Sequence, residues 1–166
     1  MQTFLPDSDF YRSARTLDRA RLGKQRVECK QLLLALGVSA GEHRPVRSKA
    51  EHQSSSWSHH PAAKMWRGYE HCLAYYGMVM ASEWISRGYR DSLHPQFKAI
   101  WDYKVVQFPR WYRDRELLER VCSSHRSNLL RKDPEWYGKF NWKEPDNLPY
   151  VWPNQTDYQV LMDSVR

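Results

Sequence analysis

The 166-residue chain is poor in cysteine and has no long apolar run. Its three cysteines, Cys29, Cys72 and Cys122, are odd in number and form no CxxC pair, which argues against a disulfide framework and favours buried, reduced thiols. No stretch approaches the roughly 18 apolar residues of a membrane-spanning helix. The N-terminal residues also lack the basic and apolar regions of a secretory signal peptide. We therefore expect a cytoplasmic protein that does not contact a membrane.

Several motifs of cofactor chemistry are also missing. The chain has no HExxH and no Cys/His ligand spacing, so we predict no metal site, although His59 and His60 stand together before Pro61. It has no P-loop, GxGxxG or GxSxG motif, which leaves nucleoside triphosphate and dinucleotide chemistry unsupported, and we expect no cofactor. His60 suits the cap of a helix that begins at Pro61. A DNA contact or a general-base role is the alternative for either histidine.

Positive charge and aromatic rings are what the chain has in excess. Lys and Arg total 26 against 19 acidic residues, which gives a net charge of +7, and there are eight Trp and ten Tyr. A basic balance favours a polyanionic partner such as nucleic acid, and aromatic side chains can fill a core or stack on bases. Composition alone leaves open a basic, soluble protein with neither role.

Hydrophobic periodicity predicts an all-α fold: a single irregular helical domain over residues 1–166, with four to six helices, long loops and an aromatic C-terminal coil. No alternating strand pattern of useful length is present. The expected helices begin near Ser8 or Asp9, run from Lys24 to Leu36 after a break at Gly23, cover 61–87, follow His94-Pro95, and cover 114–131 as one helix or a pair. Gly88 should end the helix over 61–87, and Asp133-Pro134 should cap a last turn that holds Trp136 and Tyr137. Residues 38–59 are expected to be a loop and 138–153 an ordered coil, and the tail from Thr156 could hold one more helix.

The first basic cluster lies within residues 15–26. It consists of Arg15, Arg19, Arg21, Lys24 and Arg26. Only Asp18 and Glu28 lie near enough to balance these five cations, so their mutual repulsion favours a phosphate-bearing partner. The alternative is a solvated helix face.

The second basic cluster consists of His125, Arg126, Ser127, Asn128, Arg131 and Lys132. It mixes cations with small polar groups, as backbone phosphate contact often does, and it continues into Trp136 and Tyr137. Basic residues interleaved with aromatic ones can hold an unpaired base and its backbone together. The alternative for the aromatic residues of this region is an aromatic coil that closes the core, and that alternative is strong for Trp142, Tyr150 and Trp152.

Six stretches carry a resemblance to a known family. They are QTFLP at 2–6, LDRARLGKQRVE at 17–28, HHPAAKMWRGYE at 59–70, EWISRGY at 83–89, HRSNLLRKDPEWYG at 125–138 and LPYVWP at 148–153. In these stretches the chain resembles a bacterial branch of the pyrimidine-dimer DNA glycosylases, the endonuclease V family of ultraviolet-damage repair. The resemblance covers most of residues 1–153. The characterised phage branch is similar in the basic first-helix region, the His-led central helix and the Pro-x-Trp-Tyr motif at 134–137.

The resemblance implies a DNA glycosylase with AP-lyase activity. In that family an N-terminal amine attacks C1′ of the deoxyribose and expels the base, and the imine that forms drives β-elimination. An α-amine has a pKa of roughly 7.7–8, so part of it is a neutral nucleophile at neutral pH. Here the amine is expected to be that of Met1, because the size of Gln2 should protect Met1 from removal. Glu28 is the nearest match to the family's glutamate and Asp18 is the other candidate, while Lys24 is an alternative nucleophile.

The expected substrate is duplex DNA with a damaged or modified pyrimidine, bound by a monomer. Two other readings stay open: an enzyme of the same fold that modifies a base without cleaving the strand, and a nucleic-acid-binding module without catalysis. Trapping with borohydride separates the first reading from the others, since only an imine gives a covalent adduct.

Overall fold

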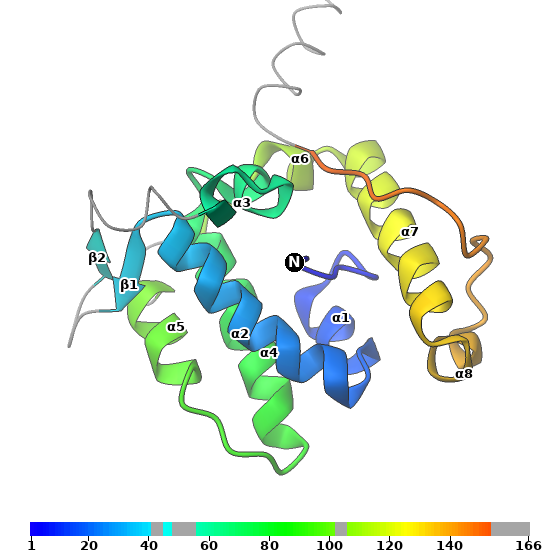
Figure 1. Cartoon of the computed structure of the whole chain (residues 1–166), viewed down its shortest axis with the longest axis horizontal. Coiled ribbons are helices and arrows are strands. Elements are labelled where there is room, and N and C mark those ends of the chain that lie inside the picture. Colours follow the sequence, from blue (N-terminus) through cyan, green and yellow to red (C-terminus); the bar gives the residue numbers. More distant parts are fainter. Residues whose placement is uncertain (41–44, 48–55, 102–105, 154–166) are drawn as a thin grey trace, which may run out of the picture.

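The computed structural model describes residues 1–40, 45–47, 56–101 and 106–153, and it confirms the all-α class. Within these residues there are eight α-helices, two 3₁₀ turns and one pair of three-residue strands (Figure 1). The elements are α1 (Phe10–Thr16), α2 (Arg19–Ala35), β1 (Val38–Ala40), β2 (Pro45–Arg47), η1 (Ser56–His59), α3 (Pro61–Trp66), α4 (Glu70–Ser86), α5 (His94–Trp101), α6 (Arg110–Arg113), α7 (Arg115–Lys132), α8 (Pro134–Tyr137) and η2 (Gly138–Phe140).

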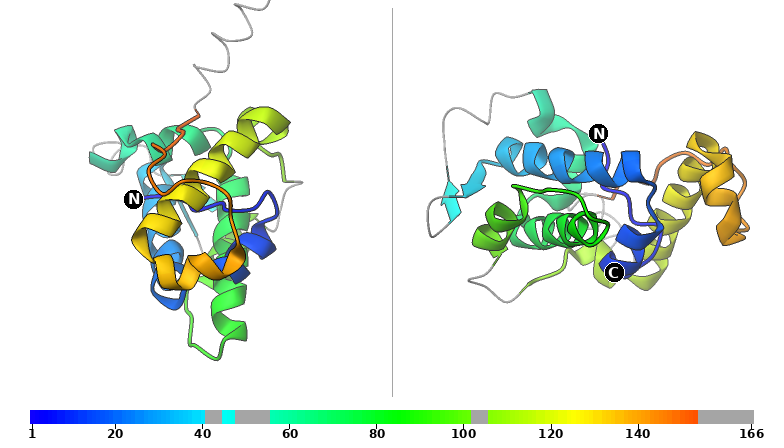
Figure 2. Two further views of the ribbon diagram at one scale, coloured as in Figure 1. Left: turned by 90° about the vertical axis from the view of Figure 1, so that its right-hand side faces the viewer. Right: turned by 90° about the horizontal axis from the view of Figure 1, so that it is seen from below.

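The helices surround the N-terminal segment. Helices α2 and α4 run side by side, α5 packs on α4, and α1 packs against α4 from the other side. Helix α7 lies across from α2, and residues 1–7 pass between the two (Figures 1 and 2). The start of the chain is therefore part of the interior of the fold.

Side-chain caps define where several helices begin. Asp9, Asp18, Asp114 and Asp133 each accept a hydrogen bond from a backbone N–H in the first turn of α1, α2, α7 and α8. Such a cap satisfies one of the donors that a helix start leaves unpaired. The predicted starts near Asp9 and residue 114 are confirmed, as is the turn capped by Asp133 before Pro134.

The predicted break at Gly23 is wrong, because α2 continues through it from Arg19 to Ala35. The glycine serves packing instead: a Cβ at this position would lie 3.0 Å from the ring of Trp84 on α4. Gly77 has the same function further along the pair, where a Cβ would come within 2.6 Å of Sγ of Cys29. These two glycines let α2 and α4 approach closely.

The helix predicted over 61–87 is divided into α3 and α4. Gly68 has a φ of +86° between them, a backbone conformation that L side chains rarely adopt. Gly88 ends α4 as predicted, with a φ of +91°. This division, together with the single turns α6 and α8, raises the number of helices above the four to six expected.

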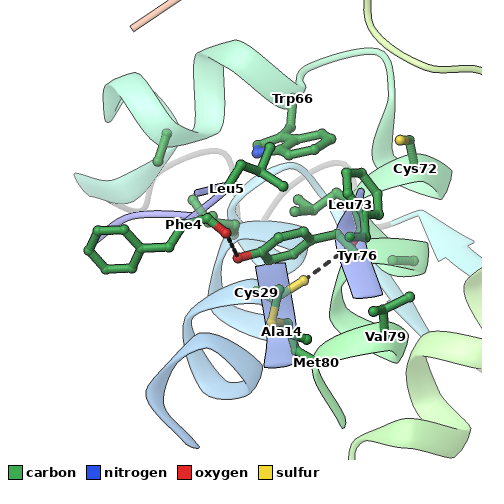
Figure 3. Packing of buried hydrophobic residues seen from close by; sticks show 14 of the residues in the cluster. Phe4, Leu5, Ala14, Cys29, Trp66, Cys72, Leu73, Tyr76, Val79 and Met80 are labelled. Atoms are coloured by element: carbon green, nitrogen blue, oxygen red, sulfur yellow. Dashed lines mark hydrogen bonds between the residues drawn. The ribbon is translucent and has the colours of Figure 1, made fainter. Parts of the chain in front are cut away.

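The segment predicted to be a loop over 38–59 contains the antiparallel pair β1–β2, with Val38 opposite Arg47, and the turn η1. The helix considered for the tail from Thr156 lies outside the described residues. All three cysteines are buried and unbridged, as expected. Figure 3 shows Cys29 in the core between α2 and α4, with its thiol donating to the carbonyl of Leu73. In the described part of the chain, no helix is long and apolar enough to cross a membrane.

Candidate active site at the N-terminus

Residues 2–5 are held in place by side chains from several helices. The N–H of Phe4 donates to Oε1 of Gln25 on α2 at 2.9 Å. The hydroxyl of Tyr76 on α4, fully buried, lies 2.8 Å from the carbonyl of Phe4 (Figure 3). It also lies 2.8 Å from Oε1 of Gln25. Burial raises the pKa of Tyr76 well above its ordinary value, so the phenol stays protonated and can donate.

Two further side chains hold the neighbouring residues. The N–H of Leu5 donates to Nδ1 of His125 on α7 at 2.8 Å, and Nε1 of Trp66 on α3 donates to Oγ1 of Thr3 at 2.9 Å. His125 is fully buried, and burial together with the charge of Arg126 lowers its pKa to about 3. It is therefore a neutral acceptor at physiological pH. Four helices thus fix the path of the chain up to Gln2.

Glu28 is the carboxylate nearest the chain start. Its Oε2 accepts from the N–H of Gln2 at 3.4 Å and from Nε2 of Gln25 at 3.2 Å. Nζ of Lys24 lies 3.8 Å from the other oxygen, one helical turn earlier on α2. The side chain of Glu28 is only 12% exposed, whereas that of Lys24 is 73% exposed. Glu28 is thus an oriented carboxylate, and Lys24 is an exposed cation beside it.

Lys24, Gln25 and Glu28 line one pocket with a volume of about 410 Å³. Met1, Lys24 and Glu28, three of the four residues predicted for catalysis, belong to its wall. Arg21 and Lys132 line it as well, one from each basic cluster, and Tyr150 of the C-terminal coil closes one side. The pocket is lined by the first residue of the chain, a carboxylate and three cations, a set that suits a nucleophilic reaction beside a phosphate.

His60 lies close to this pocket. As expected it caps α3: its Nδ1 accepts from the N–H of Ala62 at 3.0 Å. Burial and the nearby N-terminal ammonium lower the pKa of His60, while Glu28 acts in the opposite direction. The imidazole is partly buried, and His59 beside it is exposed. In the described residues no group of three or more His, Cys, Asp or Glu side chains could hold a metal ion.

Asp18, the other carboxylate considered for catalysis, does not line this pocket. It caps α2, accepts from Nη1 of Arg21 at 3.1 Å, and accepts from the hydroxyl of Tyr137. Burial opposes ionisation, but the hydrogen bonds from Tyr137 and Arg21 outweigh it and lower the pKa of Asp18. Its partners make it a structural carboxylate that ties the start of α2 to α8.

The second basic cluster is mostly turned inward. His125 and Asn128 are buried; Nδ2 of Asn128 donates to the carbonyl of Leu148 at 3.0 Å, and so holds the C-terminal coil. Arg126 is paired with Glu119 at 2.5 Å and Glu144 at 2.6 Å. In this conformation these three side chains do not form the DNA-contacting surface expected of them. Most of their partners, such as the carbonyl of Leu148 and the carboxylate of Glu144, lie outside α7.

Arg131 and Lys132, at the end of the same helix, are exposed, and Lys132 lines the pocket. The first basic cluster likewise contains both exposed cations and a cation paired within the protein. Arg15 and Arg19 are exposed, whereas Arg26 contacts the fully buried carboxylate of Asp91 and lies 4.3 Å from the ring centre of Trp84. Arg26 is thus neutralised within the protein.

The two aromatic residues expected to stack on a base already have partners. Tyr137 is fully buried against Asp18 and Trp142. Nε1 of Trp136 donates to the carbonyl of Thr16 at 2.9 Å, and Nζ of Lys139 lies 3.3 Å from the centre of its ring. Tyr137 cannot contact a base without leaving the core, and the ammonium of Lys139 covers part of the Trp136 ring.

Sequence reasoning missed Gln25 and Tyr150. Gln25 lies three residues before Glu28, so the helical spacing was a usable signal that the two side chains meet. Tyr150 had been interpreted as a core residue, and nothing in its local sequence connects it with the chain start 149 positions earlier.

A comparison with family models finds one that matches residues 1–96, described as pyrimidine dimer DNA glycosylase. Neither the curated proteins nor the solved structures include one that matches the chain.

Proposed function

The chain belongs to the pyrimidine dimer DNA glycosylase family, whose members are DNA repair glycosylases with DNA as their substrate, and from this premise we propose that it excises damaged or modified pyrimidines and cleaves the strand as an AP lyase. The observation that carries the proposal is the pocket in which Met1, Lys24 and Glu28 lie together.

The first step is base removal. The lone pair of the Met1 amine forms a bond to C1′ while the bond from C1′ to the base nitrogen breaks, and the base leaves with that electron pair and takes up a proton. Loss of a proton from the amine and opening of the sugar ring give an imine. The sugar can be reached only if the nucleotide leaves the stack, which costs a few kcal/mol of unpairing and unstacking.

The second step is strand cleavage. The imine makes the protons on C2′ acidic; removal of one expels the 3′ phosphate, and hydrolysis of the imine then frees the amine. Glu28 is the group proposed to move these protons, because it lies at the chain start and has one oxygen held by Gln2 and Gln25. Arg21 and Lys132 are proposed to hold phosphates on either side of the reacting sugar.

Lys24 is the alternative nucleophile. Its Nζ lies beside Glu28 and lines the same pocket, but its side chain is 73% exposed and therefore poorly fixed. An amine at the end of a segment tethered by four helices is better positioned for attack, and misplacement of a nucleophile by about 1 Å can cost on the order of a hundredfold in rate. We therefore assign the reaction to Met1.

The test is borohydride trapping on DNA with a single abasic site. We expect the wild-type protein to form a covalent adduct and the N-terminally acetylated protein to form none, because acetylation removes the nucleophilic lone pair. Lys24→Ala should still trap, as should the control Lys64→Ala, which removes an exposed lysine that is not among the residues lining the pocket. Mass spectrometry of the reduced adduct identifies the modified nitrogen.

Two results would refute the proposal. An adduct that survives acetylation but is lost in Lys24→Ala would move the reaction to the lysine. Absence of any adduct with the wild-type protein would remove the lyase reaction and favour base modification without cleavage, or DNA binding without catalysis.

A further inference from the structure

The C-terminal coil that carries Tyr150 is fastened along helix α7. After η2 the chain turns back and runs beside α7 (Figure 1). Nδ2 of Asn128 donates to the carbonyl of Leu148 at 3.0 Å. Further along the coil, the N–H of Val151 donates to Oγ of Ser124 at 3.2 Å. The two bonds lie on either side of Tyr150, and both side chains on α7 are buried, so the backbone at this position is fixed relative to the helix.

The ring of Tyr150 is held by neighbouring rings as well. Its centre lies 5.9 Å from that of His125 in an edge-on contact and 6.4 Å from that of Phe4. Both neighbours are buried, and His125 is itself held by the N–H of Leu5. Tyr150 is partly buried and lines the pocket. It therefore meets the pocket in a defined orientation and not as a freely rotating surface tyrosine.

The hydroxyl of Tyr150 has no hydrogen-bond partner within the part of the chain that the structure describes. The hydroxyls of Tyr76, Tyr112 and Tyr137, in contrast, each donate to an oxygen of the protein. The Tyr150 hydroxyl is also not one of the side-chain atoms that are buried without a partner, so solvent reaches it. A phenol can donate one hydrogen bond and accept others, and here all of them are left for a ligand or water.

Cations lie around this hydroxyl. Arg21 and Lys132 line the pocket together with Tyr150, one from each basic cluster. Burial raises the pKa of Tyr150, Arg131 and Arg21 act in the opposite direction, and Glu28 adds to the rise. The phenol therefore keeps its proton at neutral pH and can donate it. A hydroxyl donor beside guanidinium and ammonium groups suits an anionic oxygen, and in a DNA complex that oxygen belongs to a phosphate.

We propose that the hydroxyl of Tyr150 donates a hydrogen bond to one of the two phosphates that flank the reacting sugar. Tyr150 adds a neutral, rigidly held donor to the cations Arg21 and Lys132, and so helps to set where the sugar lies relative to Met1. This inference rests on the proposed function, because the sugar in the pocket defines which phosphates are meant. A phosphate contact positions the strand and does not read the base, so it is expected with any lesion that the pocket accepts.

The test is a binding comparison on a duplex with one tetrahydrofuran abasic site, which has no aldehyde and cannot form an imine. Tyr150→Phe keeps the ring and loses the hydroxyl, so it should bind this duplex roughly tenfold more weakly than the wild type, as expected for a lost hydrogen bond to a charged group. Its Tm should stay within about 2 °C of the wild type, because the hydroxyl has no partner in the described fold. Tyr11→Phe is the matched control, because Tyr11 is exposed on α1 and does not line the pocket.

Replacing single phosphates of this duplex with uncharged methylphosphonates locates the contact. One duplex has the methylphosphonate 5′ to the abasic site, a second has it 3′ to the site, and a third has it several nucleotides away. Where the replaced phosphate is the one that Tyr150 contacts, wild type and Tyr150→Phe should bind within about twofold of each other, because the charge that strengthens the bond is gone. On the third duplex the full difference should remain. A difference of the same size on all three duplexes, or none on the unmodified duplex, would overturn the contact.

Borohydride trapping on DNA with a natural abasic site separates this contact from the proposed function. If the wild type forms the adduct but Tyr150→Phe binds the tetrahydrofuran duplex as tightly as the wild type, the contact is wrong and the function stands. If the wild type forms no adduct while the position-dependent loss of binding is observed, Tyr150 contacts the phosphate and the lyase reaction fails.

Discussion

Replacing His125 with Asn should reduce the stability that the protein loses as the pH falls. In the folded protein burial lowers the pKa of His125 to about 3, whereas an unfolded chain has a histidine pKa of roughly 6.5. Below pH 6.5 the unfolded state therefore binds a proton that the folded state rejects, so stability falls as the pH drops toward 3. At pH 5 the difference amounts to about 2 kcal/mol, because each unit of pKa shift corresponds to about 1.36 kcal/mol.

The assay is thermal unfolding of wild type and His125→Asn between pH 7.5 and 5. For a chain of this length, 2 kcal/mol corresponds to a fall of about 4–8 °C in the Tm of the wild type, beyond what the variant loses. The Oδ1 of Asn can accept from the N–H of Leu5 as Nδ1 does, but it does not titrate, so the variant should be less stable at neutral pH yet flatter in its pH dependence. His60 and the carboxylates are present in both proteins and cancel. Parallel Tm curves would refute the buried, neutral state assigned to His125.

Three further substitutions test other parts of the site. Glu28→Gln keeps an acceptor for the N–H of Gln2 but cannot move a proton, so the single-turnover rate of trapping should fall by roughly a hundredfold or more, with DNA affinity little changed in a gel-shift titration. Arg26→Ala leaves the buried carboxylate of Asp91 without its cation, so it should lower the free energy of unfolding, measured by urea denaturation, by about 3 kcal/mol. A loss within about 0.5 kcal/mol, the usual effect of a surface substitution, would show that the pair is not buried in solution. Tyr76→Phe removes the donor to the carbonyl beneath the chain start, so it should cost about 1–3 kcal/mol in thermal unfolding and slow trapping as well; a normal trapping rate would mean that this tether does not position the amine.

Local chemistry allowed several features of the fold to be predicted from the sequence. Asp9 and Asp133 have short side chains that cap a helix within three residues, and Gly88 supplies a backbone conformation that ends one. The proximity of Lys24 and Glu28 also follows from local geometry, because residues four apart lie on the same face of a helix. Each of these features depends only on residues close in sequence.

The errors come from contacts between distant segments. Gly23 was taken as a break because glycine weakens an isolated helix, but Trp84, 61 residues later, occupies the space that a side chain would fill. His125 and Arg126 were assigned to DNA because their cluster mixes cations with small polar groups, as backbone phosphate contact often does. Their partners, the N–H of Leu5 and the carboxylate of Glu144, lie on segments that only the folded chain brings to them.

The same long-range contacts explain why the sequence could name residues of the candidate site but could not show that they lie together. Nothing local connects Met1 with Glu28; the connection is made by Gln25 and Tyr76, which hold the backbone of Phe4 in the core. Because those hydrogen bonds and the packing of the core stabilise each other, the segment that leads to Met1 has the stability of the fold itself. The amine of a lysine on an exposed helix face keeps more conformational freedom and is therefore less well oriented. For a reaction in which a nucleophile must meet one carbon of an extruded sugar, a tethered chain terminus loses less entropy on reaching that carbon than an exposed lysine does.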